Sequence, residues 1–167
     1  RDIQQRLLPT TMPSAAPLQV AAYCQPCYEV GGDFYDVIKL DERRLVVAIG
    51  DVSGKGMSAA MLMSAILAAL RAEVGHARSS GEILTTINKQ LYRITQGKSF
   101  VTLGLAIIEE SEQQATVHYA SAGHMVPYVL DADGQHIREI DCSALPLGMV
   151  EDESYSDNEQ SFQLSKG

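Results

Sequence analysis

The chain has 167 residues, of which 46% are hydrophobic, and its formal net charge is −8 at pH 7. This length suits one domain with its own core, and the apolar content excludes a disordered chain. The surplus of acidic residues argues against a nucleic-acid partner, because phosphate backbones are bound by clusters of Lys and Arg.

The first part of the chain combines a helix end with a linker. Residues 1–8 have helical spacing, and Pro9 ends them. Residues 9–17 are rich in Pro, Thr and Ser, which is typical of a linker or an extended arm leading into a domain. Leu18–Tyr23 is then expected to form a short strand.

A β-hairpin is the next predicted element. Phe34–Leu40 and Leu45–Ile49 are rich in β-forming residues and are joined by a polar turn. Because a hairpin returns the chain to its starting end, Asp33 and Asp51 should be neighbours. Carboxylate oxygens are the ligands that Mg²⁺ and Mn²⁺ prefer, so this pair predicts a site for a hard divalent cation.

Two helices follow the hairpin. Met57–Val74 is apolar on nearly every side, which predicts a helix buried between a sheet and another layer. Ser79–Glu82 is a capping box that starts a second, amphipathic helix. Its apolar stripe consists of Ile83, Leu84, Ile87, Leu91 and Ile94.

The hydrophobic period changes to two after the helices, which indicates strands. The expected strands are Phe100–Ile108, Ala115–Ala120, Val126–Leu130 and His136–Ile140. Strands, two helices and further strands are an α+β order, so we expect an antiparallel β-sandwich flanked by helices.

The glycine-rich turn Gly50–Gly56 invites a phosphate-loop interpretation, but it does not fit the Walker pattern. Three residues separate Gly50 from Gly54, and a glycine rather than Ser or Thr follows Lys55. A nucleotide-binding domain is therefore disfavoured. Spacing alone leaves two alternatives: a metal or phosphate site at Asp51 and the following helix N-terminus, or simply a capped helix entry.

Several separated motifs together resemble one family, the SpoIIE-type branch of the metal-dependent (PPM) serine/threonine protein phosphatases. The resemblance covers nearly the whole chain and keeps the motif order. The matching segments are Leu7–Pro9, Val30–Asp36, Gly50–Gly56, Phe100–Thr102, Ser121–His124 and Leu145–Gly148.

This resemblance implies an αββα fold with two Mn²⁺ or Mg²⁺ ions between two packed sheets. It implies that Asp33 and Asp51 are metal ligands and that Val52 offers its backbone carbonyl. Two cations can activate a shared water and neutralise charge on the phosphoryl oxygens, so no side-chain nucleophile is required.

Four further residues are candidates for outer-shell or substrate contacts. Asp36 is expected on the same strand face as the acidic centre, with a solvated strand carboxylate as the alternative. Glu29 could contact a metal-bound water. His124 could serve near a phosphate leaving group or be a hydrogen-bonded structural histidine, and Lys55 could meet a substrate phosphate.

Family members continue into a Thr-Asp-Gly motif and a later aspartate, both beyond Phe162–Gly167. We therefore expect residues 1–167 to be a single phosphatase domain that is incomplete at its C-terminal end and binds Mn²⁺ weakly. The alternative to an enzyme is a non-catalytic regulatory or partner-binding module that keeps the phosphatase fold.

Cysteine usage and hydropathy bear on location and partners. Cys24 and Cys27 have CxxC spacing without a second pair of ligands, so packed or half-exposed thiols are expected rather than a zinc site. We expect a cytoplasmic protein without direct membrane contact. The resemblance implies a phosphorylated anti-sigma-factor antagonist as substrate and an upstream sensor or receiver domain; homodimerisation stays open.

Overall fold

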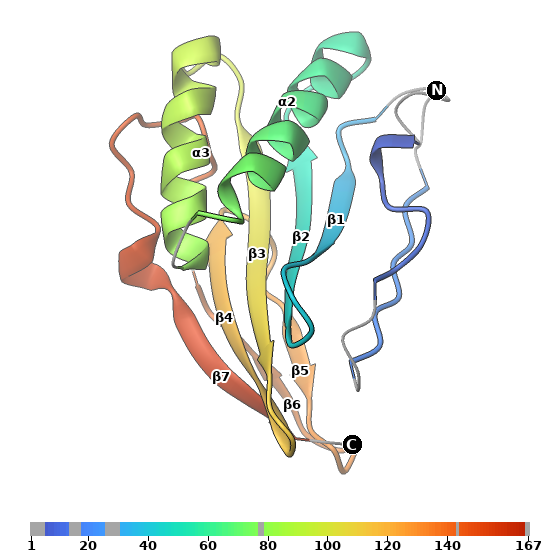
Figure 1. The fold of residues 1–167 in the computed structure, drawn as a ribbon. Coiled ribbons are helices and arrows are strands. Elements are labelled where there is room, and N and C mark those ends of the chain that lie inside the picture. Colours follow the sequence, from blue (N-terminus) through green and yellow to red (C-terminus); the bar gives the residue numbers. More distant parts are fainter. Residues whose placement is uncertain (1–5, 14–17, 26–30, 77–78, 143, 166–167) are drawn as a thin grey trace.

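The computed structural model describes residues 6–13, 18–25, 31–76, 79–142 and 144–165. Its largest element is an antiparallel sheet of five strands in the order β1-β2-β3-β4-β7 (Figure 1). The strands are β1 (Phe34–Lys39), β2 (Arg44–Val52), β3 (Val101–Glu110), β4 (Gln114–Ala122) and β7 (Gln160–Ser165).

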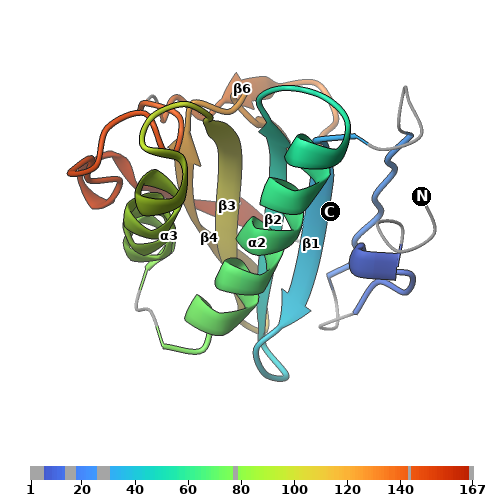
Figure 2. The same cartoon turned by 90° about the horizontal axis from the view of Figure 1, so that it is seen from above.

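Helices α2 (Met57–Glu73) and α3 (Ser80–Thr95) cover one face of this sheet. On the other face lies a two-stranded sheet of β5 (Tyr128–Leu130) and β6 (Ile137–Glu139) (Figure 2). A short 3₁₀ helix, η1 (Ser156–Asn158), precedes β7. The α+β class and the antiparallel sheet are confirmed.

The predicted hairpin is present as β1 and β2. Phe34 pairs with Gly50, and the backbone N–H of Leu40 donates to the carbonyl of Arg44 at 3.0 Å to close the turn. The Asp41 carboxylate also lies 2.7 Å from Nε of Arg44. Local turn chemistry and alternating apolar residues thus account for where this hairpin lies in the sequence.

Helix α2 is buried on one side only, so the expectation that it lies buried between a sheet and another layer is wrong. Met63 is fully buried in the main core, whereas Met57 and Met61 are 69% and 67% exposed. The helix lies on the sheet with a single face, and its outer face is lined by methionine and by small alanines that carry little apolar area.

Helix α3 follows the predicted pattern except at its last turn. Ser79 caps it by accepting a hydrogen bond from the Glu82 N–H at 3.2 Å. The stripe from Ile83 to Leu91 is buried, but Ile94 is 66% exposed. Figure 1 shows the reason, because the C-terminal end of α3 extends beyond the strands.

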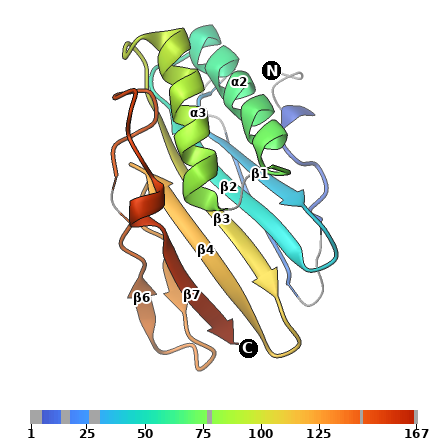
Figure 3. The same cartoon turned by 60° about the vertical axis from the view of Figure 1, so that its left-hand side comes forward.

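Strand β7 was not among the expected strands. It lies beside β4, with Tyr119 opposite Gln160 (Figure 3). The predicted strand Leu18–Tyr23 is absent, so that prediction is wrong. Of these residues only Leu18 takes part in strand pairing, as an isolated bridge.

None of the helices in the described ranges is long and apolar enough to cross a membrane.

Candidate metal centre

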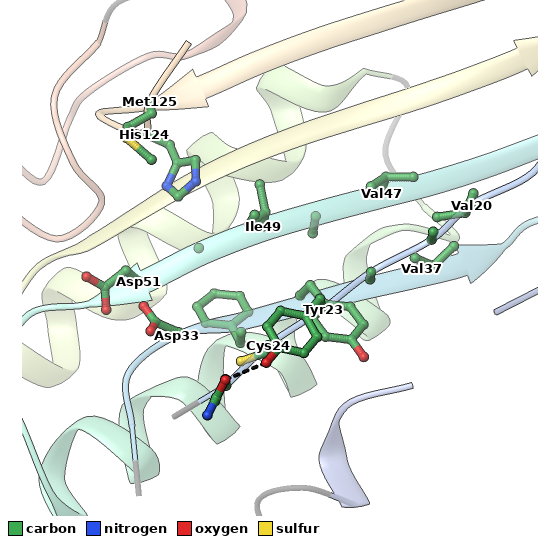
Figure 4. Close-up of a pocket in the computed structure, with 17 residues that line it drawn as sticks. Val20, Tyr23, Cys24, Asp33, Val37, Val47, Ile49, Asp51, His124 and Met125 are labelled. Atoms are coloured by element: carbon green, nitrogen blue, oxygen red, sulfur yellow. Dashed lines mark hydrogen bonds between the residues drawn. The ribbon is translucent and has the colours of Figure 1, made fainter. Parts of the chain in front are cut away.

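The hairpin brings Asp33 and Asp51 to the same end of the sheet. Residue 33 directly precedes Phe34, whose ladder partner Gly50 directly precedes Asp51. Side chains alternate along β2, so Asp51 points away from the helices while Val52 is buried beneath them. Both aspartates line a cavity of about 680 Å³ on the helix-free face (Figure 4).

The first glycine-rich motif packs directly on the second. A Cβ atom added to Gly32 would lie 2.5 Å from the Val52 carbonyl oxygen and 2.9 Å from Asp51 Oδ1. In the same contact the Val52 N–H donates to the Gly32 carbonyl at 3.3 Å. A side chain at position 32 would clash with these two oxygens, so only glycine fits there. The Val52 carbonyl and the Asp51 carboxylate thus both lie next to Gly32.

Electrostatics at the pair favours a bound cation. Burial raises the pKa of Asp51, and the neighbouring charge of Asp33 raises it further. A divalent cation relieves this repulsion, and the oxygen donors of Asp33, Asp51 and Val52 suit Mg²⁺ or Mn²⁺. Among the described residues no group of three or more His, Cys, Asp or Glu side chains forms a cluster that could hold a metal.

His124 lines the same cavity and is half-buried. Its Nδ1 lies 3.0 Å from the Thr102 hydroxyl, and Thr102 is the ladder partner of Asp51. Burial lowers the pKa of His124, and the charge of Asp33 opposes this effect. The structure therefore brings His124, which follows β4, near the acidic pair. Thr102 lies on β3, the strand between β2 and β4.

Comparison with known proteins identifies the family. The family described as Stage II sporulation protein E (SpoIIE) matches residues 41–167. The chain belongs to the SpoIIE family. Among its curated relatives is the phosphoserine phosphatase RsbU of Bacillus subtilis, 30% identical over 166 residues, which are 99% of this chain and 48% of the relative.

Solved structures agree with this family. The RsbU and RsbW domains of Rv1364c from Mycobacterium tuberculosis align with a TM-score of 0.68 and 27% identity, over 84% of this chain and 38% of that one. The PP2C phosphatase domain of SpoIIE from Bacillus subtilis shares the fold, with a TM-score of 0.63 and 21% identity over 81% of this chain and 38% of that one. The SpoIIE-family chain spans less than half the length of these relatives.

Asp36 of this SpoIIE-family chain does not share a face with the acidic pair, so that prediction is wrong. Its side chain is 4% exposed and lies 2.7 Å from Nε of Arg71 on α2. Residues three apart on a strand point to opposite faces, which places Asp36 on the helix side of β1 and Asp33 on the cavity side.

The two remaining candidates differ in how the structure describes them. Lys55 is exposed on the turn between β2 and α2 and does not line the cavity. Glu29 lies outside the described residues of the SpoIIE-family chain. Their roles stay predictions.

The motif Leu145–Gly148 is held against β3 and α3. Leu147 bridges Val101 through two backbone hydrogen bonds, of 3.0 and 2.8 Å. The buried Asn88 accepts from the Gly148 N–H at 2.7 Å through Oδ1 and donates to the Val150 carbonyl at 2.8 Å. Sequence reasoning missed Asn88, although a polar residue four places after Leu84 on an apolar stripe is a signal of a buried hydrogen bond.

Proposed function

We propose that this SpoIIE-family chain is the catalytic domain of a metal-dependent phosphatase that removes phosphate from phosphoserine or phosphothreonine in proteins. The observation that carries the proposal is the convergence of Asp33, Asp51 and the Val52 carbonyl at one end of a cavity. Membership of a family that includes a phosphoserine phosphatase supports the same reaction.

Asp33 and Asp51 would hold Mn²⁺ or Mg²⁺ ions, two in the complete domain, with the Val52 carbonyl as a further ligand. When bound, such cations supply Lewis-acid activation of the attacking water and neutralise charge on the phosphoryl oxygens. The chain's own residues orient this chemistry: the Gly32 contact fixes the Val52 carbonyl, and the β1–β2 pairing sets the spacing of the two carboxylates.

The substrate in this proposal is a small phosphorylated regulatory protein, an anti-sigma-factor antagonist, as in the branch that the sequence resembles. An upstream sensor or receiver domain would act through the N-terminal segment. Two contacts support such a route: Arg71 Nη2 donates to the Leu7 carbonyl at 2.7 Å, and the Tyr35 hydroxyl donates to the Pro9 carbonyl at 3.2 Å. They join the segment to α2 and β1.

The test is Mn²⁺-dependent release of phosphate from a phosphoserine-containing protein, measured with the full-length protein. Asp51→Asn should abolish release because it removes a charged ligand, whereas Glu42→Gln on the exposed β1–β2 turn should leave it unchanged. Undiminished turnover in Asp51→Asn would refute the assignment. Mn²⁺ binding without any turnover in the wild type would favour the non-catalytic partner-binding module.

A further inference from the structure

The structure joins two motifs whose roles the proposed function leaves open, Phe100–Thr102 and Ser121–His124. Thr102 is directly opposite Asp51 in the β2–β3 ladder, so its side chain is on the same face as the Asp51 carboxylate. Its hydroxyl is 3.0 Å from Nδ1 of His124. Asp51 on β2, Thr102 on β3 and His124 after β4 are therefore neighbours on the helix-free face of the sheet.

The turn that carries His124 is held by hydrogen bonds and close packing. The His124 N–H donates to Ser121 Oγ at 3.1 Å, and the Ser121 hydroxyl donates back to the His124 carbonyl at 3.2 Å. Ser121 is only 3% exposed. Gly123 has φ +65°, and a Cβ atom there would lie 2.6 Å from Pro146 Cγ. Ser121 thus holds the backbone of His124, and Thr102 holds its imidazole ring.

The second ring nitrogen of His124 is left for a ligand. Within the described part of the chain, no group hydrogen-bonds to Nε2. Figure 4 shows the imidazole on the same side of β2 as Asp51 and Asp33. However, His124 does not join the two aspartates in a metal-binding cluster of three among the described residues. The imidazole and the two carboxylates therefore line one cavity without forming a single metal site.

We propose that His124 is a catalytic residue that donates a hydrogen bond from Nε2 to an oxygen of the substrate phosphoryl group, and that Thr102 is its positioning residue. In this proposal the Thr102 hydroxyl is the donor to Nδ1, which corresponds to the tautomer with its proton on Nε2. The negative charge of the nearby acidic pair favours the same orientation, with N–H toward the site. This inference rests on the proposed function, because it assumes a phosphomonoester in the cavity.

Steady-state kinetics with p-nitrophenyl phosphate and inhibition by inorganic phosphate test the inference on the full-length protein. His124→Leu and Thr102→Val should raise KM and the phosphate inhibition constant by about tenfold or more, the loss expected for a hydrogen bond to a charged group. His124→Gln and Thr102→Ser, which keep an N–H donor and a hydroxyl, should recover much of the loss. Mn²⁺ affinity and Tm should stay near the wild-type values.

Two further measurements separate this inference from the proposed function. The first needs no bound metal, and the second needs no turnover. Nitrogen-15 NMR of the metal-free protein should show His124 protonated at Nε2, and Thr102→Val should change that signature. Calorimetry of inorganic phosphate with the Mg²⁺-loaded protein should show weaker binding in His124→Leu, even if the wild type hydrolyses nothing. Unchanged phosphate affinity in His124→Leu, or a matching loss of Mn²⁺ affinity, would overturn the proposal.

Discussion

Gly32 and Val52 approach so closely that a Cβ atom on the glycine would lie 2.5 Å from the Val52 carbonyl oxygen. Gly32→Ala must therefore displace the backbone that carries Asp51. We expect Mn²⁺ affinity, measured by calorimetry, to fall at least about tenfold, with a loss of stability of about 1–3 kcal/mol. Gly75→Ala is the matched control, because a Cβ there meets nothing within 4 Å. Equal Mn²⁺ affinities in the two variants would contradict this account.

Asp51→Asn should stabilise the metal-free protein at pH 7. Burial and, secondarily, the charge of Asp33 raise the pKa of Asp51 in the folded state. A carboxyl whose folded pKa is raised stabilises the fold below its unfolded pKa, about 4, and that contribution is lost as the pH rises through the folded pKa. The variant should thus have the higher Tm at pH 7.

The gain in Tm from Asp51→Asn should shrink as the pH falls from 7 toward about 4, where the wild-type carboxyl is protonated in both states. Saturating Mn²⁺ should reverse the order, because a ligand that binds only the folded wild type stabilises it. A lower Tm for metal-free Asp51→Asn across this pH range would show that the acidic pair is not repulsive.

Arg71→Met should destabilise the protein by about 2 kcal/mol, because it leaves the buried Asp36 carboxylate without its cation. The Asp36 side chain is 4% exposed, whereas Arg71 is 42% exposed, so water offsets part of the loss. Urea unfolding measures the effect, and Glu42→Gln in the exposed Lys39–Glu42 pair should change stability by less than about 0.5 kcal/mol.

A double variant identifies the cause of the Arg71 effect. Asp36→Asn combined with Arg71→Met removes both charges, so it should be more stable than Arg71→Met alone. If the double variant were instead destabilised by the sum of the two single changes, the buried carboxylate would not be the source of the loss.

Met63→Ala and Met61→Ala test which face of α2 is buried. Met63 is 0% exposed and Met61 is 67% exposed on the same helix. The first change should cost about 2–4 kcal/mol through lost packing, and the second less than about 0.5 kcal/mol. Urea unfolding of both variants measures the difference. Similar losses would mean that another part of the protein covers Met61.

Sequence patterns predicted the elements whose signals are local. The β1–β2 hairpin and the Ser79 cap of α3 depend on residues a few positions apart, and both are present. Asp33 and Asp51 could be paired from the sequence because the hairpin between them is short. Family motifs included both His124 and Thr102, but not the contact between them, because strand pairing brings the two residues together only in the fold.

The errors concern residues whose environment is set by distant partners. Asp36 is an exception, because period-two alternation alone puts it on the opposite face from Asp33; only its ion pair with Arg71 on α2 depends on the fold. Met57 and Met61 could not be separated from Met63 by hydrophobicity alone, because all three are methionines on one apolar helix. Strand β7 became a strand only by pairing with β4, far earlier in the chain.

That pairing of β4 with β7 also has a kinetic consequence. β1 and β2 are joined by a tight turn, and so are β3 and β4, whereas β5, β6 and η1 all lie between β4 and β7. Closing the longer loop loses more chain entropy, so β7 should dock after the two hairpins have formed. Until then β4 is an open sheet edge with unpaired backbone groups, and it is there that aggregation competes with completion of the fold.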